Sequence, residues 1–447
     1  MKISKSVMCV VMSVLFVVSL LSVVPVQALT PLIKEGELYV YGSSTVYPIS
    51  AQAVVPFQEY VSTLPSPFSS VKVFLNEEGS GAGFNALRAS SPTTDIAASS
   101  RSGGSTAGFY GESYPVSGSA IVNPQEFLIG YDSVAIIVPV SNTWLSQASA
   151  SEVADLFRST GNGNGVAFYR TWGDWANANG ITLPPTVAAQ EIGRIGREVS
   201  SGTFDGFNTF FLSPFGYPMA YSASTGTTGQ NWLPNNYVAL TSNQEVMTQM
   251  NQPANAFSIG FIGLGFVQGN PVGIKALNLY NPTTGAYIAP TVANVKNSVY
   301  VNNPPTGNPA VIIRPLYYFM DGIPAANSPE AVKSLWISFI KAHDEYLTKE
   351  GFITMNRVDF AGPRTGAGNS HSGNPNSSVG TQTVPDGVVD IFDLVYFTNA
   401  WIAYNSNAKQ LNPYVDISGS AGLPDGKIDF YDLVAFTNGW IAYYRNI

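Results

Sequence analysis

Cysteine is almost absent from this 447-residue chain. The single cysteine, Cys9, lies within an apolar N-terminal run. A mature chain without that run has no thiol, which excludes disulfides, zinc–thiolate sites and cysteine nucleophiles. Histidine is nearly as scarce: His343 lies on the apolar face of a predicted helix, where we expect a half-buried structural role, and His371 lies in a Gly/Ser/Asn-rich stretch. Ser-His triads and histidine metal sites are therefore excluded.

Charged side chains are also few, at 11% of the chain, while neutral polar residues abound. Without Lys2 and Lys5, which precede the apolar run, 19 basic residues face 29 acidic ones, a net charge of about −10. This balance disfavours nucleic acid as a partner. Because the overall field also repels anions, the capture of an anionic ligand must depend on local dipoles and hydrogen bonds.

Residues 1–28 have the pattern of a secretory signal peptide. Two lysines precede the long apolar run, and Val26-Gln-Ala28 offers small residues at a cleavage point near Ala28. Because the run is long for a signal peptide, an uncleaved N-terminal anchor is the alternative. No second run of that length follows, and Cys9 has no lipobox-like setting. We expect an extracytoplasmic protein, secreted, periplasmic or held at the cell surface.

Residues 29–362 are predicted to form a two-domain α/β unit, because apolar strand-like runs alternate with amphipathic helical segments. The helix with the clearest boundaries is 328–350, with Ser328 as its cap, Pro329 in its first turn and Gly351 after its end. The expected strands are Glu37–Tyr41, Val71–Leu75, Asp132–Val138, Ala256–Ile262 and Val311–Leu316.

The remainder of the chain differs in composition. Residues 363–383 are rich in glycine, serine and asparagine, which predicts a flexible linker. Residues 384–447 contain an internal duplication, in which 384–405 is echoed by 423–444 and the equivalent aspartates are 39 residues apart. This regularity indicates a module built from two copies of one unit.

Three glycine- and hydroxyl-rich turns each lead into a predicted helix: Gly42–Val46, Gly79–Phe84 and Ser201–Thr203. A turn that enters a helix points N–H groups and hydroxyls at one spot, where the helix dipole favours negative charge. Arg197 is placed to clamp the third spot from the side. Each turn alone is weak evidence, because ordinary helix capping accounts for it better. Together with Asp95–Arg101, which adds adjacent hydroxyls and a cation, the turns predict one anion site.

The order of these motifs resembles a known family. GSST, GSGAGF, DIAASSR, R-x-x-x-SGT, SIGFIGLGFV and RPLYYF follow one another between residues 37 and 362. In these motifs the chain resembles the extracytoplasmic phosphate-binding proteins that serve ABC importers. The resemblance implies a type II periplasmic-binding-protein fold, in which two α/β lobes joined by crossing strands close over one phosphate. It also implies the membrane permease of such an importer as a partner.

The same resemblance implies the contacts to phosphate. Thr45 offers its hydroxyl and N–H, Val46 its N–H, and Ser80 its hydroxyl and N–H. Arg197 forks onto two phosphate oxygens. The remaining contacts are expected from Ser100, Ser201, Gly202 and Thr203.

One position departs from part of the family. Some members carry an aspartate where Ser100 falls here, and that carboxylate accepts the proton of HPO₄²⁻, which sulfate lacks. Ser100 can accept a hydrogen bond too, but a neutral acceptor repels sulfate less than a charged one. Glu78, close in sequence to Ser80, is a candidate substitute. We expect phosphate as the ligand, with sulfate, molybdate or tungstate as the alternatives.

The duplicated tail resembles dockerin modules, in which paired EF-hand-type calcium loops precede helices and dock onto cohesin-like partners. Each copy has a glycine at the sixth loop position and acidic residues at the fifth, ninth and twelfth. At the first ligand position the spacing places Gln382 and Ala421, so Asp416 serves only through a looped-out insertion. The alternative is two capped helices whose carboxylates stabilise the helix starts. The candidate calcium ligands are Asp386, Asp390 and Asp393 in the first copy, and Asp416, Asp425, Asp429 and Asp432 in the second.

We therefore expect an exported phosphate receptor with a flexibly tethered dockerin-like module and no cofactor in the binding domain. No metal cluster, histidine or activated nucleophile accompanies the turns, so the sequence predicts a binding protein and not an enzyme such as a phosphatase. A surface adhesion or structural protein that reuses the fold is a further alternative, against which the intact Arg197 and its three turns argue.

Overall fold

A computed structural model describes most of the chain. The predicted signal peptide and the linker 363–383 lie outside the described residues, as do the candidate calcium ligands Asp386 and Asp390. The described residues are 31–101, 124–158, 168–216, 234, 236–268, 271–305, 308–355, 389, 391–406, 409–419 and 423–445.

Lobe 1 is built on a mixed sheet in the order β2-β1-β3-β13-β4. β1 pairs in parallel with β2 and β3, whereas β13 runs antiparallel to β3 and β4. Leu38 and Val40 of β1 point into the core and alternate with half-buried neighbours, the period of two that a strand requires. The elements of lobe 1 are β1 (Glu37–Ser43), α2 (Tyr47–Ser62), β2 (Lys72–Glu78), α3 (Ser80–Arg88), β3 (Ile96–Ser99), β4 (Pro124–Asp132), β13 (Arg314–Asp321), α10 (Ala331–Ala342) and α11 (Asp344–Lys349).

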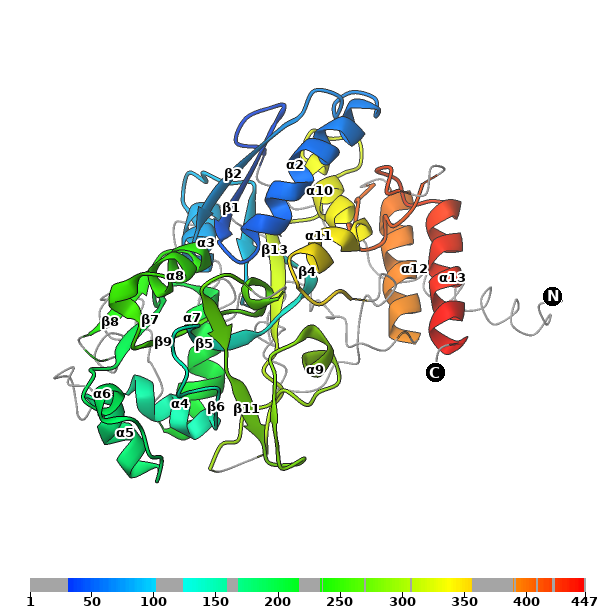
Figure 1. The fold of residues 1–447 in the computed structure, drawn as a ribbon. Coiled ribbons are helices and arrows are strands. Elements are labelled where there is room, and N and C mark those ends of the chain that lie inside the picture. Colours follow the sequence, from blue (N-terminus) through cyan, green and yellow to red (C-terminus); the bar gives the residue numbers. More distant parts are fainter. Residues whose placement is uncertain are drawn as a thin grey trace.

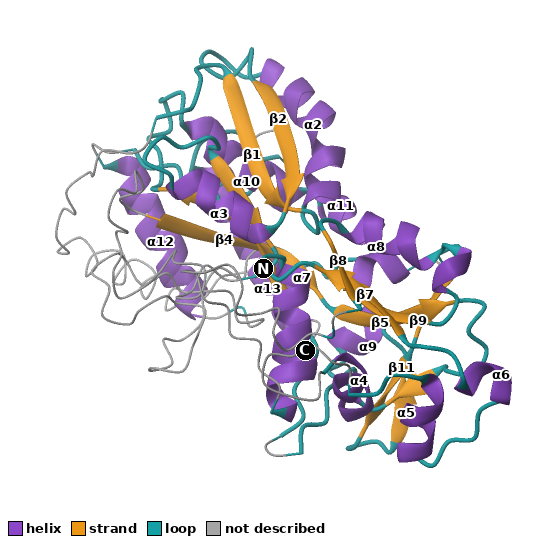
Figure 2. Ribbon diagram, turned by 90° about the vertical axis from the view of Figure 1, so that its left-hand side faces the viewer, coloured by secondary structure: helices purple, strands orange, loops and turns teal. Residues whose placement is uncertain are grey.

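Lobe 2 repeats this arrangement with other strands (Figure 2). Its main sheet has the order β10-β5-β9-β7-β8, with β7 parallel to β8 and β9, and β5 antiparallel to β9 and β10. β5 is a continuous apolar run because both of its faces are covered. The strands are β5 (Val134–Pro139), β6 (Gln147–Ala148), β7 (Gly193–Arg197), β8 (Tyr237–Leu240), β9 (Ser258–Gly263), β10 (Ile274–Ala276), β11 (Asn278–Asn281) and β12 (Ala286–Ile288). The α-helices are α4 (Ala150–Phe157), α5 (Trp172–Ala178), α6 (Pro185–Ala188), α7 (Gly202–Phe207), α8 (Asn243–Met250) and α9 (Val292–Lys296).

The chain passes between the lobes at two adjacent points. It leaves lobe 1 where β4 ends at Asp132, enters β5 at Val134, and returns at Arg314, the first residue of β13. Asp132 and Arg314 are register partners, and their side chains form a buried ion pair. The two crossings are thus tied directly to each other. The predicted strand at 132–138 is therefore divided between two strands, and the one at 311–316 begins three residues later than expected.

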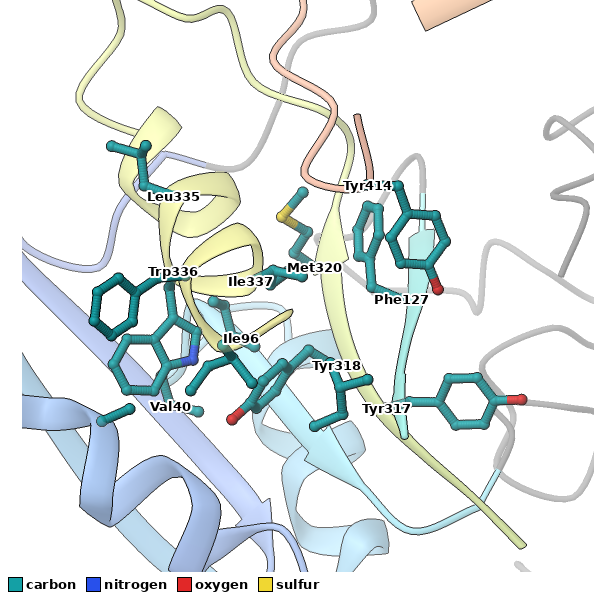
Figure 3. Packing of buried hydrophobic residues seen from close by; sticks show 14 of the residues in the cluster. Val40, Ile96, Phe127, Tyr317, Tyr318, Met320, Leu335, Trp336, Ile337 and Tyr414 are labelled. Carbon is teal, nitrogen blue, oxygen red and sulfur yellow. The ribbon is translucent and has the colours of Figure 1, made fainter. Parts of the chain in front are cut away.

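Each lobe has its own apolar core. In lobe 1, Trp336 of α10 meets Phe57 of α2 edge-on, with ring centroids 5.1 Å apart, and lies near Tyr318 of β13 (Figure 3). In lobe 2, Phe207 of α7 stacks on Phe261 of β9 at 4.0 Å. Because α7 is anchored by this stack, the turn that precedes it has a rigid base.

The predicted helix 328–350 is divided in two. α10 begins after Glu330, and the backbone of His343 (φ −117°) breaks the helix before α11. His343 is half-buried, and its Nδ1 lies 2.7 Å from the carbonyl oxygen of Phe339. This confirms the structural role expected of the histidine. Gly351 follows the helical segment with φ +71°, which confirms the predicted stop.

The tail helices, α12 (Ile391–Asn405) and α13 (Phe430–Arg445), lie side by side next to lobe 1 (Figure 1). Phe397 of α12 and Phe436 of α13 stack 5.0 Å apart, and both belong to the same apolar cluster as the lobe 1 core. The cluster also includes Val389, Leu411, Tyr414, Val415 and Ile428 of the tail. The described part of the tail is therefore packed onto lobe 1, which corrects the prediction of a flexibly tethered module.

Tyr414 makes the most specific contact between the tail and lobe 1. Its ring stands edge-on to Phe127 at 5.3 Å, and its hydroxyl accepts a hydrogen bond from the N–H of Leu128 and donates one to the carbonyl of the same residue at 3.1 Å (Figure 3). Lys341 of α10 lies 3.6 Å from the centroid of the Tyr414 ring. Because β4 is the edge strand of its sheet, Tyr414 satisfies backbone groups that would otherwise lack a strand partner.

Candidate functional site

The predicted turns meet at the carboxyl ends of the parallel strands of both sheets. In lobe 1 they follow β1, β2 and β3, and in lobe 2 the turn at Ser201–Thr203 follows β7. Ligands of open α/β sheets bind at this edge, beside the point where the strand order reverses. In both sheets the order reverses at the strand next to an edge: β1 lies between β2 and β3, and β7 lies between β8 and β9. The turns are thereby placed opposite one another between the lobes.

Five of the predicted site residues come together across this junction. Thr45 Oγ1 of lobe 1 lies 3.2 Å from Thr203 Oγ1 of lobe 2. The backbone N–H of Ser100 donates to Ser80 Oγ at 3.1 Å. Gly202 packs directly on Ser100, so that a Cβ added to this glycine would lie 2.8 Å from the Ser100 carbonyl oxygen. All of the hydroxyls named here are at most 1% exposed.

Arg197, the last residue of β7, lies at the same junction. Its Nη1 donates to Ser44 Oγ of lobe 1 at 2.6 Å, its Nε donates to the carbonyl of Leu240 at 3.1 Å, and its Nη2 donates to the carbonyl of Thr241. Burial lowers the pKa of the guanidinium to about 10. The guanidinium therefore remains cationic at neutral pH. Its hydrogen-bond acceptors are neutral oxygens and not a carboxylate.

Two predicted contacts lie at the junction but are engaged within their own turns. The N–H of Val46 donates to the carbonyl of Ser43 at 3.0 Å, and is not presented to the junction in this structure. The side chain of Ser201 caps α7 by accepting from the N–H of Phe204 at 3.1 Å. The Ser201 hydroxyl thus stabilises the helix whose start carries Gly202 and Thr203.

Glu78 does not supply the carboxylate that Ser100 lacks. Its side chain is exposed and hydrogen bonds to the hydroxyl of Tyr41, whose pKa is raised to about 12 by burial and by this carboxylate. Burial raises the pKa of the Asp205 carboxyl in α7, and the charges of Arg101 and Arg314 oppose that rise.

Sequence reasoning missed three buried residues at the junction, namely Asp132, Asn243 and Arg314. Asn243 Nδ2 and Arg314 Nη2 donate to Thr45 Oγ1 at 3.2 and 3.3 Å. Asn243 could have been found from the sequence, because it begins a helix shortly after a strand, the same pattern in which the predicted turns occur. Arg314 begins the RPLYYF motif, but its pairing with Asp132 had no signal, because it joins strand ends 182 residues apart.

In the second acidic loop of the tail, the carboxylates accept hydrogen bonds from backbone N–H groups of the same loop. The two carboxylate oxygens of Asp416 accept from the N–H groups of Asp425 and Gly426, at 3.1 Å each, and Asp432 accepts from the N–H of Asp429 at 2.8 Å. Burial raises the pKa of Asp416, and it raises the pKa of Asp432 to about 7. Among the residues that the structure describes, no group of three or more His, Cys, Asp or Glu side chains is arranged to hold a metal ion.

In the first copy, only Asp393 of the candidate calcium ligands lies in a described range, and it is buried in α12. Calcium binding by either loop stays a prediction. Within the described ranges, no helix combines the length and the apolarity needed to cross a bilayer.

These features define a two-lobed α/β protein with a polar, cationic junction between its lobes. The sequence is 22% identical over 330 residues to protein SphX of Synechocystis sp., a match that covers 74% of this chain and 82% of SphX. No protein-family model matches the chain.

Two solved structures show a similar arrangement of elements. An ABC-type phosphate transport receptor from Vibrio cholerae is 20% identical, with a TM-score of 0.43 over 71% of this chain and 99% of the receptor. A phosphate-binding protein from Stenotrophomonas maltophilia is 16% identical, with a TM-score of 0.47 over 71% of this chain and 90% of that protein. The likenesses are distant, so the functional argument rests on the geometry of the junction.

Proposed function

We propose that this protein is an extracytoplasmic receptor that captures inorganic phosphate and delivers it to an ABC importer. The observation that carries the proposal is the convergence of four buried hydroxyls, those of Thr45, Ser80, Ser100 and Thr203, with the guanidinium of Arg197. Several charge-assisted hydrogen bonds of this kind are sufficient for micromolar or tighter binding, even in a protein of negative net charge.

Binding requires the two lobes to move. Because the polar groups are buried between the lobes, a ligand reaches them only when the lobes separate. The contacts of Arg197 with Ser44 and of Thr45 with Thr203 hold the lobes together in the closed arrangement. An anion that bonds both lobes stabilises this arrangement, and the permease then recognises the closed shape.

Phosphate is favoured over sulfate if a group at the junction accepts a hydrogen bond from the protonated oxygen of HPO₄²⁻, which sulfate lacks. Ser100 accepts a hydrogen bond from the hydroxyl of Ser43 at 3.1 Å, which leaves it a further lone pair. The alternatives are receptors for sulfate, molybdate or tungstate, or a surface protein that retains the fold without transport.

Calorimetric titration with phosphate, with sulfate and molybdate as competitors, tests the proposal. We expect phosphate to bind with a dissociation constant in the micromolar range or below, and sulfate to displace it only at much higher concentration. Preferred binding of sulfate or molybdate would change the assigned ligand but would still support a role as an oxyanion receptor. Absence of binding for all three oxyanions would overturn the proposal.

We also propose that the signal peptide directs export, with cleavage near Ala28, and that the second acidic loop binds calcium. Asp416 is fully buried beside two further carboxylates, Asp425 and Asp432, and their mutual repulsion favours a divalent cation. The carboxylates must move closer together to form such a site, since they do not form a metal-binding group as they stand. Calcium titration of the intact protein and of Asp416→Asn tests this proposal, and an unchanged calorimetric trace would refute it.

A docking role for the tail is proposed from the sequence repeat. The packing of the tail on lobe 1 restricts a cohesin-like partner to the outer faces of α12 and α13, where Phe430 and Tyr431 are exposed. Co-sedimentation of the intact protein with its own cell-surface fraction, with and without calcium, tests this role.

A further inference from the structure

The hydroxyl of Thr45 is the meeting point of three side chains at the junction. Thr203 Oγ1 lies at 3.2 Å, Asn243 Nδ2 at 3.2 Å and Arg314 Nη2 at 3.3 Å. All four residues are at most 3% exposed, so water does not compete for these contacts. They come from different parts of the chain: Thr45 from lobe 1, Thr203 and Asn243 from lobe 2, and Arg314 from the crossing strand.

The hydrogen-bonding capacity of the Thr45 hydroxyl decides what these contacts mean. A hydroxyl has one proton and two lone pairs. The amide nitrogen of Asn243 and the guanidinium nitrogen of Arg314 act only as donors, so together they use both lone pairs. With both lone pairs occupied, the Thr45 hydroxyl can form a further hydrogen bond only by donating its proton to an acceptor.

Both donors are held in place by further contacts. Arg314 forms its ion pair with Asp132 at the crossing of β4 and β13, and the carboxylate fixes the direction of the guanidinium. Asn243 is the first residue of α8, and its Oδ1 faces the N–H of Gly263 at 3.5 Å. With its oxygen on that side, the amide turns its NH₂ group toward Thr45.

We propose that Asn243 and Arg314 are positioning residues that make the Thr45 hydroxyl an obligate hydrogen-bond donor to the bound anion. The inference rests on the proposed phosphate-binding function. In this structure the proton of Thr45 has Thr203 as its acceptor. In the complex an anion oxygen takes that place, and the hydroxyl of Thr203 is free to donate to the anion as well. A pre-oriented donor loses less entropy when it binds than a freely rotating one.

Closure and donor orientation are coupled in this arrangement. Asn243 belongs to lobe 2 and reaches Thr45 only when the lobes are together, whereas Arg314 stays beside it at the crossing. The hydroxyl is therefore committed as a donor only in the closed state. The anion consequently binds the closed form more tightly than the open form, which is the condition for a ligand to drive closure.

A double-mutant cycle on the intact protein, with inorganic phosphate as the probe, tests the proposal. The variants are Thr45→Val, Asn243→Ala and their combination. We expect Asn243→Ala to weaken binding about tenfold in the wild-type background, the effect of losing one well-formed hydrogen bond, and to have almost no effect in the Thr45→Val background. Equal effects in the two backgrounds would overturn the proposal, because an Asn243 with a merely structural role acts independently of the hydroxyl.

Two further measurements keep the outcomes separate. Asn302→Ala removes another buried asparagine of lobe 2, which bonds the backbone of Phe210 and Ala310, and should lower the melting temperature without changing the affinity for phosphate. Arg314→Lys keeps a donor to Thr45 and should bind phosphate more tightly than Arg314→Met, whose side chain cannot donate; if the two variants bind equally, the role of Arg314 is refuted. A wild-type protein that fails to bind phosphate would refute the proposed function itself. A wild-type protein that binds phosphate while the cycle shows no coupling would refute only this inference.

Discussion

Arg197 Nη1 of lobe 2 donates a 2.6 Å hydrogen bond to Ser44 Oγ of lobe 1. The arginine ends β7 and the serine follows β1, so the bond joins the carboxyl ends of equivalent strands in the two sheets. The hydrogen bonds of this guanidinium go to one hydroxyl and two carbonyls. A buried cation with neutral partners retains its charge for an incoming anion.

Removal of this cation should weaken phosphate binding strongly. We expect Arg197→Ala to cost about 2–5 kcal/mol of binding free energy, since the anion is left buried without its charge partner. Arg197→Lys should recover part of the loss, because lysine restores the charge but not the two-pronged geometry. Calorimetry measures both effects. Arg170→Ala is the control, since that arginine is exposed on the surface of lobe 2 and pairs with Glu191; comparable losses in the two alanine variants would contradict the assignment.

Gly202→Ala should block closure of the lobes. The added Cβ would lie 2.8 Å from the carbonyl oxygen of Ser100 in the opposite lobe, which is closer than van der Waals contact allows. We expect at least a ~10-fold loss of phosphate affinity with little change in melting temperature, because neither core is altered. Gly180→Ala provides the contrast: its φ of +67° strains an alanine and nothing lies within 4 Å, so it should lose stability and keep its affinity.

Tyr414→Phe should destabilise the contact between the tail and lobe 1. The variant leaves the N–H and carbonyl of Leu128 without their partner, at a cost of about 1–3 kcal/mol of unfolding free energy. Denaturant unfolding of the whole protein measures the loss. Tyr444→Phe, at a position that is 54% exposed, should be neutral. Identical unfolding midpoints for the two variants would show that the tail does not stabilise lobe 1 through this residue.

The stability of the tail should fall as the pH rises. Burial raises the pKa of Asp432 from 3.8 to about 7, so the folded state binds this proton more tightly than the unfolded state does. The stability gained is present at low pH and is lost as the pH rises through about 7. Without calcium, we expect a lower melting temperature at about pH 8 than at about pH 5.5, and Asp432→Asn should reduce the difference. A melting temperature that rises over this range would contradict the assignment, and calcium should remove the decline if the second loop binds it.

The predicted turns were found from the sequence because each is a local pattern. Thr45, Ser80 and Thr203 stand at starts of helices that follow strands, and the carboxyl ends of parallel strands meet at one edge. Asn243 belongs to the same pattern and could have been recognised. The pairing of Asp132 with Arg314 depends on how two crossing strands align, and no local pattern carries that information.

The relation of the tail to lobe 1 could not be predicted for a similar reason. The composition of residues 363–383 indicates a flexible connection and says nothing about where the following segment packs. The 39-residue repeat was read correctly as two helices, yet the segment between them contacts α10 and β4 of lobe 1 through Tyr414. The break at His343 was also missed, because the apolar periodicity of 328–350 continues across it.

The tail contacts described above all lie on lobe 1, whereas Arg197 and Asn243 belong to lobe 2. If the tail attached the molecule to a surface, lobe 1 would be held in place and lobe 2 would remain free to move. The half that swings would carry the guanidinium, and the half that stays still would present the hydroxyls of Thr45 and Ser80. In such a receptor lobe 1 would be immobilised, and lobe 2 would make the whole of the closing movement.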